Sequence, residues 1–242
     1  MGKTTSTVNI GAYMAAKGKR VLLVDLDPQG NLSSSLGVFG RELGTYEVMI
    51  GKISASEAIV ATPQENMSIL PSNLRLSGAA VELADIEDRN YFLKRAIEPQ
   101  VLEFDYVLID CPPSLGILTL NGFVAAKAVI VPLQCEFFAL EGFMNMLSQT
   151  IRRIQTSLNV ELLVGGVIFT MYDPRTRIAH EVIQQMKTTF KKYPNFLFKT
   201  VIPRNIRLAE APSHGMPINK YAPSCIGARS YAALTEEVMR RV

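Results

Sequence analysis

Short apolar runs alternate with longer amphipathic stretches along almost the whole chain, and this alternation restricts the folds open to it. Several runs are rich in Val, Ile and Leu without polar alternation, which is typical of strands buried on both faces of a parallel sheet. The runs predicted as strands are 21–27, 67–71, 105–110, 128–133, 162–169 and 198–202. The stretches predicted as helices are 4–17, 78–87, 91–98, 115–126, 140–158, 178–193 and 226–241. The pattern predicts an α/β fold with a mostly parallel sheet flanked by helices.

The chain shows no linker, internal repeat or low-complexity segment, so residues 1–242 are expected to form a single domain. A hydrophobic content of 48% against 19% charged residues fits a folded globule with a core. The three cysteines lie far apart without a CxxC or His/Cys cluster, which argues against a disulfide framework or a zinc site. No signal-peptide pattern opens the chain, and glycines and prolines interrupt the apolar runs before they could cross a bilayer. We expect a cytoplasmic protein.

Gly2-Lys3-Thr4-Thr5 leads directly into the first predicted helix, which is the arrangement of a phosphate-binding loop. In such a loop the backbone N–H groups and the helix N-terminus face the anion, the lysine reaches the β- and γ-phosphates, and the first threonine hydroxyl binds Mg²⁺. The tetrapeptide alone is weak evidence, because an ordinary helix start can contain it. Its weight comes from carboxylates elsewhere in the chain.

Two carboxylate positions follow predicted strands. Asp25 and Asp27 end the run 21–27, and alternation along a strand points both side chains the same way. The carboxyl ends of parallel strands form the edge where open α/β sheets bind ligands, although the Asp-Pro and Gly-Asn pairs here also suit a plain turn. Asp110 ends the apolar run 106–110, which is the Walker B arrangement that holds Mg²⁺ directly or through water. Together with the phosphate loop, these carboxylates predict a nucleoside triphosphate site.

Four segments resemble the ParA/Soj chromosome- and plasmid-partitioning ATPases, which are relatives of MinD. The segments are GKTTSTVNIGAYMAAKGKRVLLVDLDPQGNLSSSLG, YVLIDCPPSLG, VPLQCEFFALEG and VIPRNIRLAEAPSHGMPI. The resemblance spans nearly the whole chain, and the last two segments favour the Soj branch over MinD and the nitrogenase iron protein. It implies the P-loop NTPase fold of ParA and MinD, ATP and ADP as ligands, Mg²⁺ as the metal, and hydrolysis of ATP to ADP and phosphate.

The resemblance also implies roles for single residues. Lys3 would bind phosphate and serve catalysis, and Asp27 would position or activate the attacking water. Thr4 and Asp110 would hold the metal. The nucleotide contacts would come from Gly2, Lys3, Thr4, Thr5, Pro203 and Asn205, with Thr5 at the α-phosphate and the last two at the adenine. For the last two, a simple turn before a helix is the alternative.

Proteins of this family form an ATP-dependent homodimer that binds DNA non-specifically, and a DNA-binding protein of the ParB/Spo0J type stimulates hydrolysis and release. A basic segment fits that expectation, because eight basic residues stand against one acidic residue, Glu181, between positions 175 and 207. A solvated helix face is the alternative for any single one of them. We expect a nucleoid-associated protein without stable membrane association. The predicted DNA contacts are Arg175, Arg204 and Arg207, with looser candidates at Lys187 and Lys199.

The resemblance has one gap, at the N-terminus. Family members carry a strand and then Lys-Gly-Gly-Val before Gly-Lys-Thr-Thr, whereas Met1 stands here at the place of the valine. We expect an N-terminally truncated member that lacks an interior strand, half of the phosphate loop and the signature lysine, and that binds and hydrolyses ATP poorly. The alternatives are a hydrolysis-deficient interaction or DNA-binding protein and a MinD-like regulator of division at the membrane surface.

Overall fold

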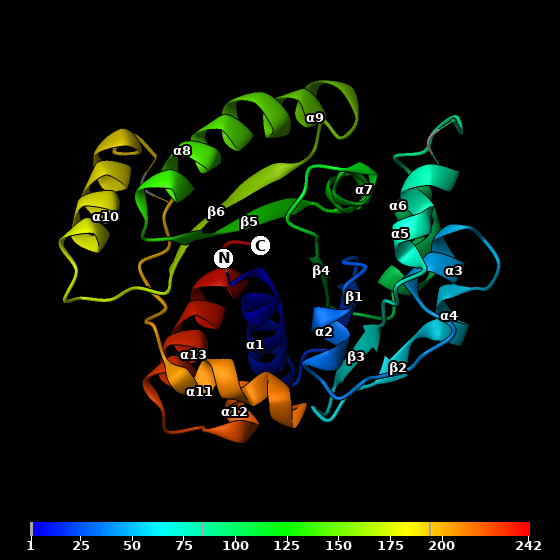
Figure 1. The fold of residues 1–242 in the computed structure, drawn as a ribbon, viewed down its shortest axis with the longest axis horizontal. Coiled ribbons are helices and arrows are strands. Elements are labelled where there is room, and N and C mark those ends of the chain that lie inside the picture. The colour runs from blue at the N-terminus through cyan, green and yellow to red at the C-terminus, as the bar shows by residue number, and fades with distance from the viewer. Residues whose placement is uncertain (1, 84, 194) are drawn as a thin grey trace.

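Six strands form two groups in the computed structural model, which describes residues 2–83, 85–193 and 195–242 (Figure 1). In the first group β1 (Val21–Asp25), β3 (Met67–Leu70) and β4 (Tyr106–Asp110) are parallel, and the short β2 (Val60–Ala61) pairs antiparallel with β3. The order is β2-β3-β1-β4. In the second group β5 (Ala128–Gln134) and β6 (Leu163–Thr170) are parallel. The predicted α/β fold with a mainly parallel sheet is therefore present. Met1, on which the prediction about the missing motif depends, lies outside the described residues.

The register of β1 against β4 prepares the site. Val21 pairs with Tyr106, and four residues later Asp25 pairs with Asp110. Because parallel neighbours end at the same edge of a sheet, this pairing brings the two predicted carboxylate positions together. Every residue of β1 is buried, as its unbroken apolar run predicts.

The sheet is divided between β4 and β5. Strand β4 is the edge of the first sheet, and β5 belongs to the second. Helix α1 (Lys3–Ala16) joins the two parts, since one apolar core combines its side chains with Leu23 of β1 and Ile168 of β6. Among the described residues no strand lies between β4 and β5. Residues 106–109 are accordingly only partly buried, although the run is apolar.

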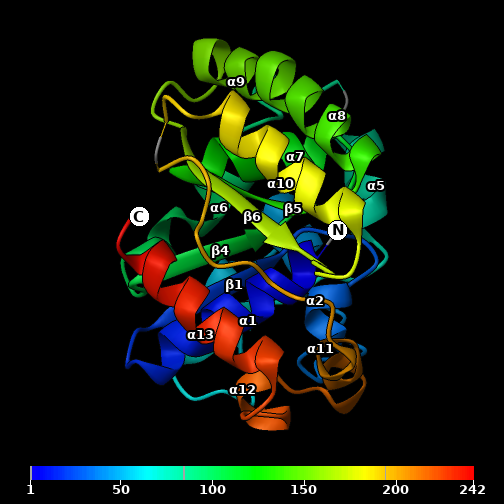
Figure 2. The same ribbon diagram turned by 90° about the vertical axis from the view of Figure 1, so that its left-hand side faces the viewer.

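Helices cover both sheets (Figures 1 and 2). The C-terminal α13 (Ile226–Met239) packs along α1, and its buried Tyr231 hydroxyl lies 3.1 Å from Ser6 Oγ. No helix in the described part of the chain is long and apolar enough to span a membrane. A second core holds the opposite face of the first sheet to α3 (Thr45–Met49), α4 (Ala55–Ala58), α5 (Leu76–Glu82), α6 (Phe92–Val101) and α7 (Ile117–Ala125). Around β5 and β6 lie α8 (Phe137–Asn145), α9 (Arg152–Ser157) and α10 (Arg177–Thr189).

The predicted helices are present with shifted ends, apart from the one over 140–158. That helix is divided, because a π-helical segment, Met146–Ile151, separates α8 from α9. The elements that the sequence analysis missed span only two to five residues, too few for a hydrophobic period to show. They are β2, α2 (Asn31–Ser34), α3, α4, α11 (Ile206–Glu210), the 3₁₀ turn Ala211–His214 and α12 (Ile218–Tyr221).

The prediction of a strand over 198–202 is wrong. The segment runs beside β6, and the N–H groups of Phe198 and Ile202 bond β6 carbonyls at 3.0 and 2.8 Å. Between these points the carboxylate of Glu237 on α13 accepts the N–H groups of Lys199 and Thr200, at 2.8 and 2.9 Å. A side chain from a distant helix thus takes the donors that a continuous strand would give to a ladder.

Candidate nucleotide-binding site

Gly2 begins α1 in a left-handed conformation, with φ 74° and ψ 18°, which glycine adopts without steric cost. The Ser6 N–H bonds Gly2 O at 3.0 Å, so the N–H groups of the preceding turn point out of the helix N-terminus. No acidic side chain occupies this first turn. The N-terminus of a helix of 14 residues attracts anions through its outward N–H groups and its dipole. The start of α1 therefore suits a phosphate group.

Thr4 and Asp110 meet beside this helix start. Thr4 Oγ donates a hydrogen bond of 2.6 Å to Asp110 Oδ2, from a residue that is 106 positions away in the chain. Burial raises the pKa of Asp110 to about 7; the Thr4 bond and Lys3 lower it, and the Asp25 and Asp27 carboxylates raise it. Two oxygen donors converge here, and oxygen ligands are those that Mg²⁺ prefers. Within the described residues no cluster of three or more His, Cys, Asp or Glu side chains could hold a metal. Phosphate and water oxygens would have to complete the shell, as is usual for Mg²⁺.

Asp25 holds the loop after β1 together. Its Oδ2 accepts the Ser33 N–H at 2.8 Å and the Ser33 hydroxyl at 2.6 Å, and its Oδ1 accepts the Asp27 N–H at 3.2 Å. Burial raises the pKa of Asp25 to about 6, against the lowering effect of these bonds. Ser33 Oγ in turn accepts the Ser72 N–H at 3.0 Å, which connects α2 to the end of β3. Both Asp25 oxygens are thus engaged in structure.

Asp27 forms a tight turn at the same edge. Its Oδ1 accepts the Gln29 N–H at 3.0 Å, and its carbonyl accepts the Gly30 N–H at 2.9 Å. Gly30 has φ 62°, as such turns require of a glycine. The carboxylate nevertheless lies close enough to Asp110 to raise the pKa of that group. The turn that the sequence suggested is confirmed, while the catalytic role of Asp27 stays a prediction.

Asn205 approaches α1 from a different part of the fold. It precedes α11, does not cap that helix with its side chain, and has a buried Oδ1 without a hydrogen-bond partner in the described structure. Leu208 of α11 and Thr5 of α1 line one small cavity of about 10 Å³, which places α11 against the phosphate-loop helix. A buried acceptor without a donor costs about 1–3 kcal/mol. Asn205 therefore fits a ligand that supplies an N–H group, such as adenine. Contacts from Asn205 and from Pro203 remain predictions.

The three arginines predicted to contact DNA differ in the ion pairs that they form within the protein. Arg175 makes a two-pronged ion pair with Asp173, at 2.9 Å from Nε and 2.7 Å from an Nη atom, and this pair holds the pKa of Asp173 well below its usual range. Arg207 pairs with Glu210 at 2.9 Å. For Arg204 the described structure shows no ion pair, although its charge also lowers the pKa of Asp173. Asp173 and Glu210 stand just outside the segment 175–207. A count of charges within that segment therefore overestimates the positive charge that is not paired within the protein.

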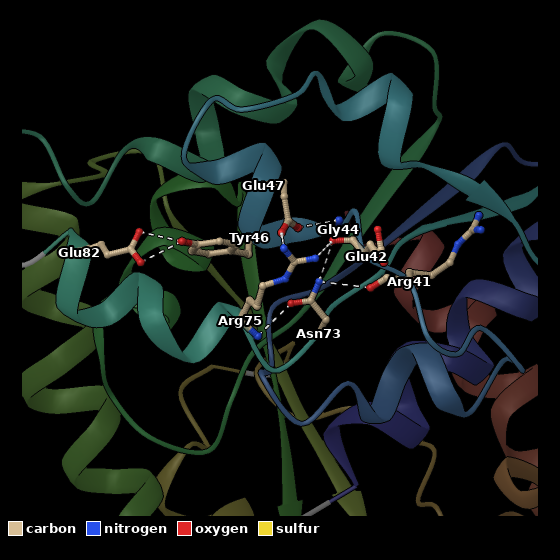
Figure 3. Close-up of polar contacts among 8 residues, drawn as sticks. All are labelled: Arg41, Glu42, Gly44, Tyr46, Glu47, Asn73, Arg75 and Glu82. Atoms are coloured by element: carbon tan, nitrogen blue, oxygen red, sulfur yellow. Dashed lines mark hydrogen bonds and ion pairs between the residues drawn. The ribbon is translucent and has the colours of Figure 1, made fainter.

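A polar cluster that the sequence analysis missed anchors the loop between α2 and α3 (Figure 3). Glu47 is 1% exposed; its Oε2 accepts the Gly44 N–H at 3.0 Å, and its Oε1 lies 3.2 Å from an Arg75 Nη atom. Arg75 also bonds the Glu42 carbonyl, and its N–H is held by Asn73 Oδ1 at 2.9 Å. A glutamate three residues after a helix-capping position is the signal that could have found this cluster.

Thr45 connects this cluster to the site. Its Oγ donates to Asp25 O at 2.8 Å and to Pro71 O at 3.1 Å, so that the start of α3 is bonded to the carboxyl ends of β1 and the β3 segment. A Cβ atom on Gly44 would lie 2.4 Å from Pro71 O, which leaves room only for glycine. The edge of the sheet after β1 and β3 is therefore held by hydrogen bonds with Thr45 of α3 and with Ser33 of α2.

Comparisons with known proteins extend over the whole chain. A protein-family model described as an AAA domain matches residues 1–164. The chromosome-partitioning ATPase Soj of Treponema pallidum is 51% identical over 241 residues, which cover 100% of this chain and 93% of that protein. The sporulation initiation inhibitor protein Soj of Bacillus subtilis is 45% identical over 240 residues, which cover 98% and 93%.

Solved structures show the same fold. Cobyrinic acid a,c-diamide synthase from Mycobacterium smegmatis, with bound ADP and magnesium, is 38% identical with a TM-score of 0.83, over 99% of this chain and 89% of that one. The cell division ATPase MinD of Pyrococcus furiosus is 25% identical with a TM-score of 0.80, over 100% and 94%. The similarity thus includes the phosphate loop, both carboxylate positions and the C-terminal helices.

Proposed function

Because the chain belongs to the Soj/ParA family of chromosome-partitioning ATPases, we propose that it is an ATP-dependent switch that dimerises with bound ATP and binds DNA without sequence preference. The family hydrolyses ATP to ADP and phosphate, and Mg²⁺ accompanies the nucleotide, as the M. smegmatis relative illustrates. The biological setting is chromosome or plasmid segregation in the cytoplasm, on the nucleoid, with a ParB/Spo0J-type DNA-binding protein as the partner that stimulates hydrolysis.

The observation that carries the proposal is the contact of the α1 N-terminus with Asp110, whose pKa is in turn raised by the carboxylates at the end of β1 and in the loop after it. Gly2 and Thr4 belong to the helix start, Asp110 ends β4, and Asp27 follows β1. A helix N-terminus alone binds many anions, and two buried carboxylates alone repel them. Together they suit a phosphate chain that brings a divalent cation with it, because the positive charge of the cation offsets the repulsion between the carboxylates and the phosphates.

Each residue has a proposed task in this arrangement. Gly2 and Lys3 hold the β- and γ-phosphates, Thr5 holds the α-phosphate, and Asp27 orients the attacking water. Thr4 and Asp110 would hold Mg²⁺, which when bound neutralises charge on the phosphate oxygens. The Asp25–Ser33 bonds keep the Asp27 turn in place, and so limit the movement of the water that it orients. Pro203 and Asn205 would contact the adenine.

A paired substitution on β4 tests the nucleotide site. Asp110→Asn should abolish Mg²⁺-dependent turnover and weaken binding of fluorescent ATP in the presence of Mg²⁺. Asp105→Asn is the matched control, since Asp105 lies next to the opposite end of the strand and pairs with Arg20 at 3.0 Å. It should leave both measurements unchanged. Equal activity of the two variants would reject the assignment of Asp110.

A second function is a family member that binds nucleotide or DNA without turnover. The observation that favours it is the position of β4, which carries Asp110 on the edge of a sheet rather than between two strands. An edge strand holds its side chains less firmly, and a small displacement of a catalytic group costs much of the rate. Normal ATP-dependent retention on DNA combined with no measurable phosphate release would support this function over the first.

We also propose that the chain makes no stable association with a membrane, in contrast to a MinD-like regulator. The support is the packing of α13, whose buried residues include Tyr231, Leu234 and Val238 in the core around α1. An amphipathic helix that binds a bilayer must present its apolar face to lipid. Sedimentation with anionic vesicles tests the proposal, and co-sedimentation of the protein would contradict it.

A further inference from the structure

A concave apolar pocket with a basic rim lies between α10 and the segment that follows it, and the described residues that line it include none of the proposed nucleotide contacts. Its volume is about 330 Å³, at the lower end of the range for small-ligand sites. Phe190 and Phe198 are among its apolar walls, and both are at most 9% exposed. In Figure 2, α10 and the segment after it face the viewer.

Three lysines surround this pocket, and no carboxylate is among the described residues that line it. Lys187 comes from the last turn of α10, Lys191 follows that helix, and Lys199 stands on the segment beside β6. All three are exposed, and none forms an ion pair within the described residues. The nearby acids are already engaged within the protein: Glu181 pairs with Arg177 at 2.7 Å, and Glu237 accepts the backbone N–H groups of Lys199 and Thr200. The positive charge at the rim is therefore available to an outside partner.

We propose that this pocket docks an acidic peptide segment of a partner protein, with one large apolar side chain in the cavity and carboxylates on the three lysines. Charge complementarity selects an acidic partner, and the aromatic walls select an apolar anchor. Tyr193, which is 64% exposed at the pocket, adds an amphipathic surface of the kind enriched where proteins dock peptides. Duplex DNA fits less well, because its bases are stacked inside the helix and it presents phosphates to a flat surface rather than an apolar group to a cavity.

The chain contains a matched control for the charge. Lys191 lines the pocket, whereas Lys192 next to it is also exposed and is not among the described lining residues. The two residues carry the same charge on the same turn, so they contribute alike to any general attraction for anions. Only a partner seated in the pocket distinguishes them.

The test measures fluorescence anisotropy of a labelled peptide with four glutamates around one phenylalanine, added to the full chain without nucleotide. Exchanging the phenylalanine for alanine should weaken binding about tenfold to a hundredfold, the loss that one buried aromatic side chain predicts. Lys191→Ala should weaken it about twofold to fivefold, and Lys192→Ala should change it less than Lys191→Ala does. Thermal melting checks that both variants fold.

Three results would overturn the proposal. Equal losses for Lys191→Ala and Lys192→Ala would show general electrostatic attraction. Equal binding of the alanine peptide would show that the cavity is not used. Binding of a duplex oligonucleotide that depends on Lys191 but not Lys192, with no binding of either peptide, would assign the pocket to nucleic acid. Because no nucleotide is present, these outcomes do not depend on the proposed ATPase function.

Discussion

Asp110→Asn should stabilise the nucleotide-free protein above neutral pH, although it removes a residue proposed for the active site. The substitution keeps the shape of the side chain and an oxygen that can accept the Thr4 hydroxyl, now 2.6 Å from Asp110 Oδ2. What it removes is a buried negative charge beside two further carboxylates, Asp25 and Asp27.

The magnitude follows from the raised pKa of Asp110. In the folded protein this pKa is about 7, against an ordinary value of 3.8, so the folded state retains a proton that the unfolded state has released between about pH 4 and pH 7. Stability is therefore lost as the pH rises through that window. A difference of about three units at about 1.4 kcal/mol each is about 4 kcal/mol. The amide has its own cost of burial, so we expect the variant to gain about 2–4 kcal/mol at pH 8 and little at pH 4.

Urea unfolding followed by circular dichroism, with EDTA and without nucleotide, measures this difference. The wild type should lose stability between pH 4 and pH 8 more steeply than the variant does. Asp105→Asn is the control with the opposite sign, because Arg20 lowers the pKa of Asp105 and the ionised form of that group is favoured in the fold. A stability change for Asp110→Asn that is the same at pH 4 and pH 8, or a loss at pH 8, would refute the reasoning.

Three further predictions concern other parts of the molecule. Arg204→Glu should weaken retention of the protein on DNA and reduce the salt dependence of that binding, while nucleotide affinity stays unchanged. A nitrocellulose filter assay at several salt concentrations measures this. An unaltered salt slope would show that Arg204 does not contact DNA. Glu47→Ala should lower the free energy of unfolding, measured with urea, by about 1–3 kcal/mol, because the Gly44 N–H loses its acceptor and Arg75 loses its ion-pair partner. A decrease below about 0.5 kcal/mol would mean that the cluster does not anchor the loop. Gly2→Ala should destabilise the start of α1 by about 1–2 kcal/mol, because Gly2 has a positive φ. The free energy of ATP binding should fall by more than the free energy of unfolding does. Unchanged ATP affinity would contradict the phosphate-loop assignment.

Several features of the fold could be predicted because they are local. The run from Val21 to Val24 is apolar at every position and is completely buried, as a strand between two layers must be. Helix α1 could be predicted from the stretch that begins at Gly2-Lys3-Thr4-Thr5, since a glycine before a run of helix-compatible residues is a local signal of a helix start. The placement of Asp25 and Asp110 at one edge of the sheet followed from the rule that parallel strands end there, whereas their direct pairing appears only in the structure.

Other features depend on partners that are distant in sequence. Glu237 takes the N–H groups of Lys199 and Thr200, 38 and 37 residues away, and thereby ends a strand that β-propensity alone predicts. The ion pair of Asp173 with Arg175, by contrast, joins residues only two positions apart, but it depends on the conformation of the turn that contains them. The sequence also does not show that Lys191 lies at the rim of a pocket whose described lining contains no carboxylate, because the folded chain brings the lining residues together.

By itself, then, the sequence determined the α/β class, the phosphate-loop helix and the family, because periodicity and motif spacing are properties of neighbouring residues. Only the tertiary structure decided how each carboxylate is hydrogen-bonded within the protein. Asp25 and Asp27 stand two residues apart on the same run, yet Asp25 uses both carboxylate oxygens to accept hydrogen bonds from the loop, whereas Asp27 accepts the Gln29 N–H through Oδ1 in a tight turn. The reason is that hydrogen-bond donors and burial are supplied by other elements, and their positions exist only in the folded chain.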